Sequence, residues 1–65
     1  MKMYKHKLNI VYERNYGGLF WAVVKNPDGR YIGWDGVGDV CDDCPAIFDS
    51  FDEAKRWADM QWRYS

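Results

Sequence analysis

A chain of 65 residues is near the lower limit at which a single hydrophobic core is sufficient. Its composition, 48% hydrophobic and 18% aromatic, supplies a core and argues against disorder. The net charge of -1 disfavours nucleic acid and anionic membranes as partners, and no segment approaches the roughly 20 apolar residues that span a bilayer. Because the first residues also lack a signal-peptide run, we expect a cytoplasmic protein.

Three strands are predicted in the first half of the chain, over about residues 7–14, 19–26 and 30–35. The first alternates apolar and polar residues, and the second, LFWAVV, is apolar at both parities. Two turn signals separate the strands. NYGG supplies glycines for a tight hairpin, and NPDG is a strong turn sequence.

A loop is predicted over residues 36–49, followed by a helix over about residues 51–63. Ser50 and Glu53 form a capping box, and apolar residues then recur with helical spacing. We therefore predict one α+β domain over residues 1–65. It is a three-stranded antiparallel β-meander with one C-terminal α-helix packed on one face (β-β-β-α).

The side chains beneath the helix are predicted from strand parity. A three-residue loop at 27–29 places Asn26 opposite Arg30. An odd-length first loop, Tyr16-Gly17-Gly18, then places the alternating apolar residues of the first strand on the helix-covered face. An even loop would instead place Glu13 on the helix-covered face. The predicted core is Leu8, Ile10, Tyr12, Phe20, Ala22, Val24, Ile32, Trp34, Phe51, Ala54, Ala58 and Trp62.

The opposite sheet face is the candidate binding surface, because one helix cannot cover both sides of a sheet. Exposed Trp and Tyr on a rigid sheet are residue types enriched at interface hot spots. An alternative is that Val40, Ala46, Ile47 and Phe48 fold back and cover this face. The predicted binding residues are Glu13, Trp21, Val23, Lys25, Tyr31 and Asp35, with Val11 beside them.

The stretch VCDDCP contains the two cysteines of the chain, Cys41 and Cys44. A C-x-x-C pair is half of a zinc site, and completing it needs His6 with an aspartate or a second chain. Redox activity is disfavoured because the neighbouring aspartates raise a thiol pKa. The nearby carboxylates do not have calcium-loop spacing. We expect no cofactor, with a zinc-linked dimer through Cys41 and Cys44 as an alternative.

Catalysis has no clear sequence signature. His6 lies in a basic N-terminal stretch, expected to be mobile, without an adjacent nucleophile motif. We predict that the protein is not an enzyme.

The segments FWAVVKNPDGRYI and FDSFDEAKRWAD resemble the AP2-like N-terminal DNA-binding module of tyrosine integrases. The similarity covers about two thirds of the chain, from Leu19 to Asp59. It implies three strands plus a helix, with the sheet face opposite the helix entering the major groove. The DNA-contacting candidates that it implies are Arg14, Trp21, Lys25, Arg30 and Tyr31. Glu13 and Asp35, which flank Trp21, depart from the basic pattern of that family.

Small size, acidity and aromatic content also resemble the accessory proteins encoded by phages and mobile elements. The leading hypothesis is a non-enzymatic protein-interaction module that binds a protein partner or forms a homodimer through the Trp21 and Tyr31 face. The alternatives are a DNA-binding module of the integrase type and the zinc-linked dimer.

Overall fold

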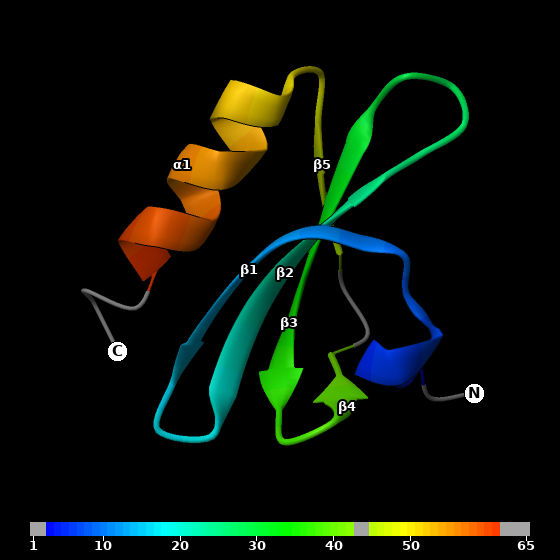
Figure 1. Ribbon diagram of the computed structural model, residues 1–65. Helices are drawn as coiled ribbons and strands as arrows, with labels where there is room; N and C mark the ends of the chain where they lie inside the picture. Colours follow the sequence, from blue (N-terminus) through cyan, green and yellow to red (C-terminus); the bar gives the residue numbers. More distant parts are fainter. Residues whose placement is uncertain (1–2, 43–44, 62–65) are drawn as a thin grey trace.

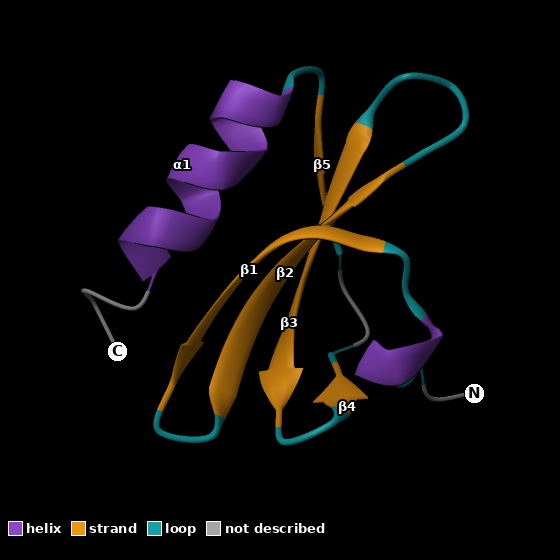
Figure 2. Cartoon of the chain, in the orientation of Figure 1, coloured by secondary structure: helices purple, strands orange, loops and turns teal. Residues whose placement is uncertain are grey.

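The computed structural model describes residues 3–42 and 45–61, which form an antiparallel sheet and one C-terminal helix (Figure 1, Figure 2). The predicted α+β class is confirmed. Strands β1, β2 and β3 make the predicted meander, and two short strands extend it. The elements in chain order are the 3-10 turn η1 (Lys5–Lys7), β1 (Ile10–Tyr16), β2 (Leu19–Lys25), β3 (Tyr31–Val37), β4 (Val40–Cys41), β5 (Ala46–Phe48) and α1 (Phe51–Gln61).

The two hairpins follow from their turn residues. Tyr16 pairs with Leu19, so β1 and β2 are joined by the two-residue turn Gly17-Gly18. Both glycines have positive φ, 55° and 87°, as a tight hairpin requires. The predicted odd-length loop is therefore wrong. In the second hairpin the Asn26 amide donates to the Arg30 carbonyl at 2.8 Å, which confirms the predicted register.

The stretch predicted as an irregular loop is partly β-structure. β3 continues to Val37, two residues beyond its predicted end, before β4 and β5. Both short strands pair antiparallel with β3, β4 near its C-terminal end and β5 near its N-terminal end. Residues 40–41 and 46–48 therefore widen the sheet, and the expectation that they fold over one face as a loop is wrong.

The helix begins where the capping box predicts. The Glu53 amide donates to the Ser50 hydroxyl at 3.3 Å, and α1 starts at Phe51. Asp52 and Glu53 lie in the first turn, where negative charge favours the helix dipole. The predicted core residue Trp62 lies outside the described residues.

The helix covers the sheet face opposite to the predicted one. Trp21 and Val23, at 5% and 0% exposure, pack with Ala54 and Ala58 of α1 in the helix-side cluster. Partly buried side chains surround these four; they are Tyr12, Leu19, Tyr31, Phe48, Phe51 and Trp57. The expected core face of Phe20 and Ala22 therefore lies on the other side of the sheet.

Two local features explain this difference in facing. Gly33 leaves room for the helix, since a Cβ built on it would lie 2.5 Å from Cζ3 of Trp57. A register irregularity between Ile10 and Tyr12 places Tyr12 opposite Val23, on the helix side, while Ile10 stays opposite Val24. Such a β-bulge changes side-chain parity within one strand, so simple alternation assigns one of the two residues to the wrong face.

A second buried group, the outer cluster, lies on the sheet face away from α1. It contains Phe20, Ala22 and Cys41, with Leu8, Ile10 and Trp34 packed against it. Figure 1 shows η1 beside β4 and away from α1. Residues 3–8 of the N-terminal stretch, expected to be mobile, lie on the sheet, where this segment pairs with β4 and contacts the outer cluster.

Candidate interaction surface on the outer face

We call the sheet side away from α1 the outer face. Its most prominent feature is a set of aliphatic side chains that are paired across four strands. Val24 of β2 lies opposite Ile10 of β1 and Ile32 of β3, and Ile32 lies opposite Ile47 of β5. Directly opposed residues in an antiparallel sheet point to the same side. These four residues, Ile10, Val24, Ile32 and Ile47, therefore form one continuous line, the aliphatic row.

The aliphatic row is open to solvent, above all at its β5 end. Ile47 is 65% exposed, and the other three members are half-buried. Trp34, which lies opposite Ala22 on the same face, is also half-buried. Large apolar side chains gathered on one face of a rigid sheet are typical of protein-contact surfaces.

The other end of the outer face is covered by residues 3–8, which we call the N-terminal strap. Its backbone extends the sheet beside β4. The Lys5 amide donates to the Asp39 carbonyl at 2.8 Å, and the Cys41 amide donates to the Met3 carbonyl at 2.9 Å. Tyr4 forms an antiparallel bridge with Val40. The strap thereby shields the free edge of β4 in the way that natural sheets protect their edges.

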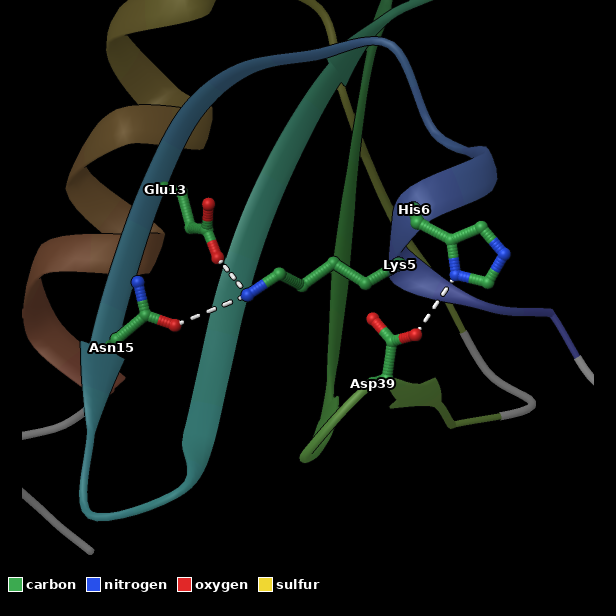
Figure 3. A network of polar contacts seen from close by, with 5 residues as sticks. All are labelled: Lys5, His6, Glu13, Asn15 and Asp39. Carbon is green, nitrogen blue, oxygen red and sulfur yellow. Dashed lines mark hydrogen bonds and ion pairs between the residues drawn. The ribbon is translucent and has the colours of Figure 1, made fainter.

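Lys5 holds the strap against the sheet through its side chain (Figure 3). Its ammonium forms an ion pair with Glu13 and donates to Oδ1 of Asn15 at 3.4 Å. Glu13 and Asn15 are two residues apart on β1, so they point to the same side of the sheet. The Lys5 Nζ also lies 5.1 Å from the centre of the Phe20 ring, within cation–π range.

A second polar contact ties the strap to the turn after β3. Nδ1 of His6 lies 2.8 Å from Oδ2 of Asp39 (Figure 3). The imidazole also stacks on Tyr4, with ring centres 5.8 Å apart. Both partners of this contact are more than half exposed, so water competes with it more than with the Lys5–Glu13 pair, whose side chains are 26% exposed.

The predicted binding residues are separated by this fold. Trp21 and Val23 are buried beneath α1, so a binding surface that includes them as exposed contacts is wrong. Tyr31 also contacts the helix side, with its ring centre 5.6 Å from that of Phe51. Glu13 lies on the outer face, where Lys5 pairs with it. Lys25 is exposed at the end of β2.

Asp35 lies on the helix side, opposite Trp21, and is half-buried. Burial raises the pKa of its carboxyl, and the charge and hydrogen bond of Asp42 raise the pKa further. The Asp42 amide also donates to the Asp35 carbonyl at 2.7 Å. Asp35 is therefore part of a close carboxyl pair at the β3–β4 end of the sheet.

Sequence reasoning missed the role of the aliphatic row. It placed Ile10, Val24, Ile32 and Trp34 beneath the helix, and it placed Ile47 in a loop. The alternation that marks a half-buried strand cannot be detected in β5, which has only three residues. The apolar character of β2 at both parities was the usable signal, because it indicates that both faces of the sheet carry apolar residues.

The cysteine motif has one described member. Cys41 is buried in β4, and burial, together with the charges of Asp39, Asp42 and Asp35, raises the pKa of its thiol. This agrees with the expectation that neighbouring aspartates oppose a reactive thiolate. Cys44 and Asp43 lie outside the described residues. Within residues 3–42 and 45–61, no group of three His, Cys, Asp or Glu side chains is placed to hold a metal ion.

The cations implied by the integrase resemblance do not lie on the outer face. Arg14 is opposite Trp21 on the helix side, with its Nε 3.6 Å from Oδ1 of Asp59. Lys25 is opposite Tyr31, also on the helix side by register. Arg30 lies in the β2–β3 turn, with its Nε 3.7 Å from Oδ1 of Asp49. The resemblance places DNA contacts on the face away from the helix, and the aliphatic row occupies that face here.

Comparisons with protein-family models, with curated proteins and with solved structures found no significant match. In the part of the chain that the structure describes, no helix is long and apolar enough to cross a membrane.

Proposed function

We propose that this chain is a small non-enzymatic protein-interaction module whose contact surface is the aliphatic row with Trp34. The observation that carries the proposal is the exposure of Ile47 at the end of a line of apolar side chains on the outer face. Burial of apolar surface is the main favourable term in most protein association. The same side chains would contribute that term if a partner covered them.

The sheet beneath the row supports its use for recognition. β2 is paired on both sides, and α1 packs against β2 and β3 from behind. Val and Ile also have few χ1 rotamers, so ordering them in a contact loses little conformational entropy. A contact surface on such a rigid support needs little reorganisation before binding.

The proposal is tested with one disruptive variant and one matched control. Ile47→Lys places a charge on the aliphatic row. Val37→Lys places the same charge at a strand position of similar exposure, since Val37 is 63% and Ile47 is 65% exposed. Val37 lies opposite Leu19, on the helix side of the sheet. Both changes are at exposed positions, so we expect both variants to fold.

Tagged wild-type protein and both variants are used to isolate binding partners from the source cells. Each partner is then purified and titrated by isothermal calorimetry. We expect Ile47→Lys to weaken binding at least about tenfold, because the contact would bury an unpaired ammonium, and Val37→Lys to bind like wild type. Equal affinity of every purified partner for wild type and Ile47→Lys would overturn the proposed surface.

Duplex DNA serves as the comparison ligand in the same titrations. An integrase-type module predicts binding at low salt that weakens steeply as salt rises. Such binding, if it survived Ile47→Lys and were lost on replacing Lys25 or Arg30, would favour the DNA-binding alternative over the proposal.

A further inference from the structure

We propose that the occupant of the aliphatic row is the aliphatic row of a second copy of this chain, in a face-to-face homodimer. This inference rests on the proposed function, because it names the partner of the same surface. Two properties of the outer face support a second copy, namely its chemistry and its charge balance, and its size sets the expected affinity.

The first property is the self-complementary chemistry of the row. Ile10, Val24, Ile32 and Ile47 are all β-branched aliphatic residues, and they stand on adjacent strands of one sheet. Two sheets with such faces pack about 10 Å apart, with the side chains of one face fitting between those of the other. A two-fold axis would bring the same patch of both copies into contact.

The second property is charge balance. A two-fold contact brings the same patch of both copies together, so a patch with an uncompensated net charge would repel its copy. The four row residues and Trp34 have no ionisable group. On the neighbouring part of the outer face, the Glu13 carboxylate is already paired within the chain by Lys5. The patch can therefore meet its own copy without like-charge repulsion from these groups.

Size sets the expected affinity. The row residues and Trp34 are five side chains, and only Ile47 among them is exposed, whereas about 20–30 residues from each partner form a standard interface. The N-terminal strap occupies one end of this face, beside β4 and over Phe20. The remaining contact is smaller than standard, and we expect a weak dimer, with a Kd on the order of 10 µM to 1 mM.

Sedimentation equilibrium of the full chain from about 10 µM to 1 mM tests the inference, using wild type, Ile47→Lys and Val37→Lys at equal concentrations. We expect wild type and Val37→Lys to form dimers over the same range. Ile47→Lys is expected to raise the Kd at least about tenfold, because each dimer would bury two ammonium groups. Circular dichroism verifies that all three proteins are folded.

Amide chemical shifts of wild type, recorded over the same concentration range, locate the contact. We expect the concentration-dependent shifts to concentrate at the row residues of β2, β3 and β5. Shifts concentrated instead at Tyr16, Leu19 and Val37, or equal Kd values for both lysine variants, would overturn the inference.

A monomeric wild type at 1 mM would also overturn the inference. The proposed function would survive that result if a purified heterologous partner bound wild type and Val37→Lys at least about tenfold more tightly than Ile47→Lys. If no partner showed that difference and wild type remained monomeric, both proposals would fail.

Discussion

The Tyr12 hydroxyl donates a hydrogen bond to the Asp59 carboxylate, and this contact joins β1 to α1 across 47 positions of sequence. The contact lowers the pKa of Asp59 and raises the pKa of Tyr12. Nζ of Lys55, which lies 3.2 Å from Oδ2 of Asp59, further lowers the pKa of Asp59. Lys55 lies on α1 itself, so the helix is held to the edge of the sheet by Tyr12 and by Arg14 of β1, whose Nε lies 3.6 Å from Oδ1 of Asp59.

Replacing Tyr12 by Phe should lower the free energy of unfolding by about 1–2 kcal/mol near neutral pH, because a partly buried hydrogen bond to a charged group is lost. A group with a lowered folded pKa stabilises the protein above its unfolded pKa of about 3.9, and this contribution is lost as pH falls through the folded pKa. The penalty should therefore shrink below about pH 3. Urea unfolding followed by Trp fluorescence measures this penalty. Equal penalties near neutral pH and below about pH 3 would contradict a hydrogen bond from Tyr12 to the charged Asp59 carboxylate.

The Asp35–Asp42 pair should produce the opposite pH dependence. The pKa of Asp35 is raised in the folded protein. Its favourable contribution to the free energy of unfolding is therefore full below the unfolded pKa of about 3.9, and it is lost as pH rises through the folded pKa. Asp42→Asn removes the like charge, so it should stabilise the protein at neutral pH by about 0.5 kcal/mol, since Asp42 is exposed and screened. The gain should vanish at about pH 3, where the Asp35 carboxyl, whose pKa is raised, is protonated and has no charge for Asp42 to repel. Stability curves of the two proteins from acid to neutral pH test this; a gain independent of pH would be inconsistent with it.

Gly33 and Trp57 should show strong energetic coupling. A methyl group at position 33 would meet three atoms of the Trp57 ring, at 2.5, 2.8 and 2.9 Å. Gly33→Ala should therefore lower the free energy of unfolding by about 2–3 kcal/mol. In the background of Trp57→Leu the same change should be at least about 1 kcal/mol less severe, because the ring is absent. Chemical denaturation of wild type, the two single variants and the double variant completes the double-mutant cycle. Additive effects would show that Gly33 does not make room for the Trp57 ring.

Gly36→Ala is a useful contrast to the Gly33 cycle. A Cβ at position 36 would lie 2.0 Å from the Val40 carbonyl oxygen, which belongs to the backbone. No side-chain replacement can relieve that contact. We therefore expect Gly36→Ala to destabilise the protein in the wild-type and Trp57→Leu backgrounds alike.

The N-terminal strap should loosen when the charge of Lys5 is removed. Lys5→Met retains an unbranched stem over Phe20 but leaves the Glu13 carboxylate without its ammonium partner, and both side chains of the pair are only 26% exposed. We expect hydrogen exchange at the amides of residue 5 and Cys41, which carry the strap's backbone bonds, to accelerate about tenfold. NMR-detected exchange measures these rates.

Two further variants separate charge from packing in the strap. Adding Glu13→Gln to Lys5→Met should restore part of the protection, because no buried charge is then left unpaired. His6→Gln should change the same rates less than about threefold, since the His6–Asp39 contact is exposed. If His6→Gln had the larger effect, the assignment of Lys5 as the main anchor would be wrong.

Several features of the fold could be predicted from short-range patterns. The Asn-Pro-Asp-Gly turn specified the β2–β3 register, and Ser50 specified where α1 begins, because turns and caps depend on residues adjacent in sequence. β4 and β5 could not be predicted, since they have two and three residues and depend on pairing with β3.

The sequence by itself determined the α+β class, the three-stranded meander, the helix and the presence of apolar residues on both sheet faces. Only the tertiary structure decided which face α1 covers. β2 is apolar at both odd and even positions, so its pattern does not indicate which face the helix covers. That choice depends on packing between residues distant in sequence. The space above Gly33 accepts Trp57 on one side, and Lys5 anchors the strap over Phe20 on the other. Those contacts bury Trp21 and leave Ile47 exposed, which moves the candidate binding surface to the opposite face of the sheet.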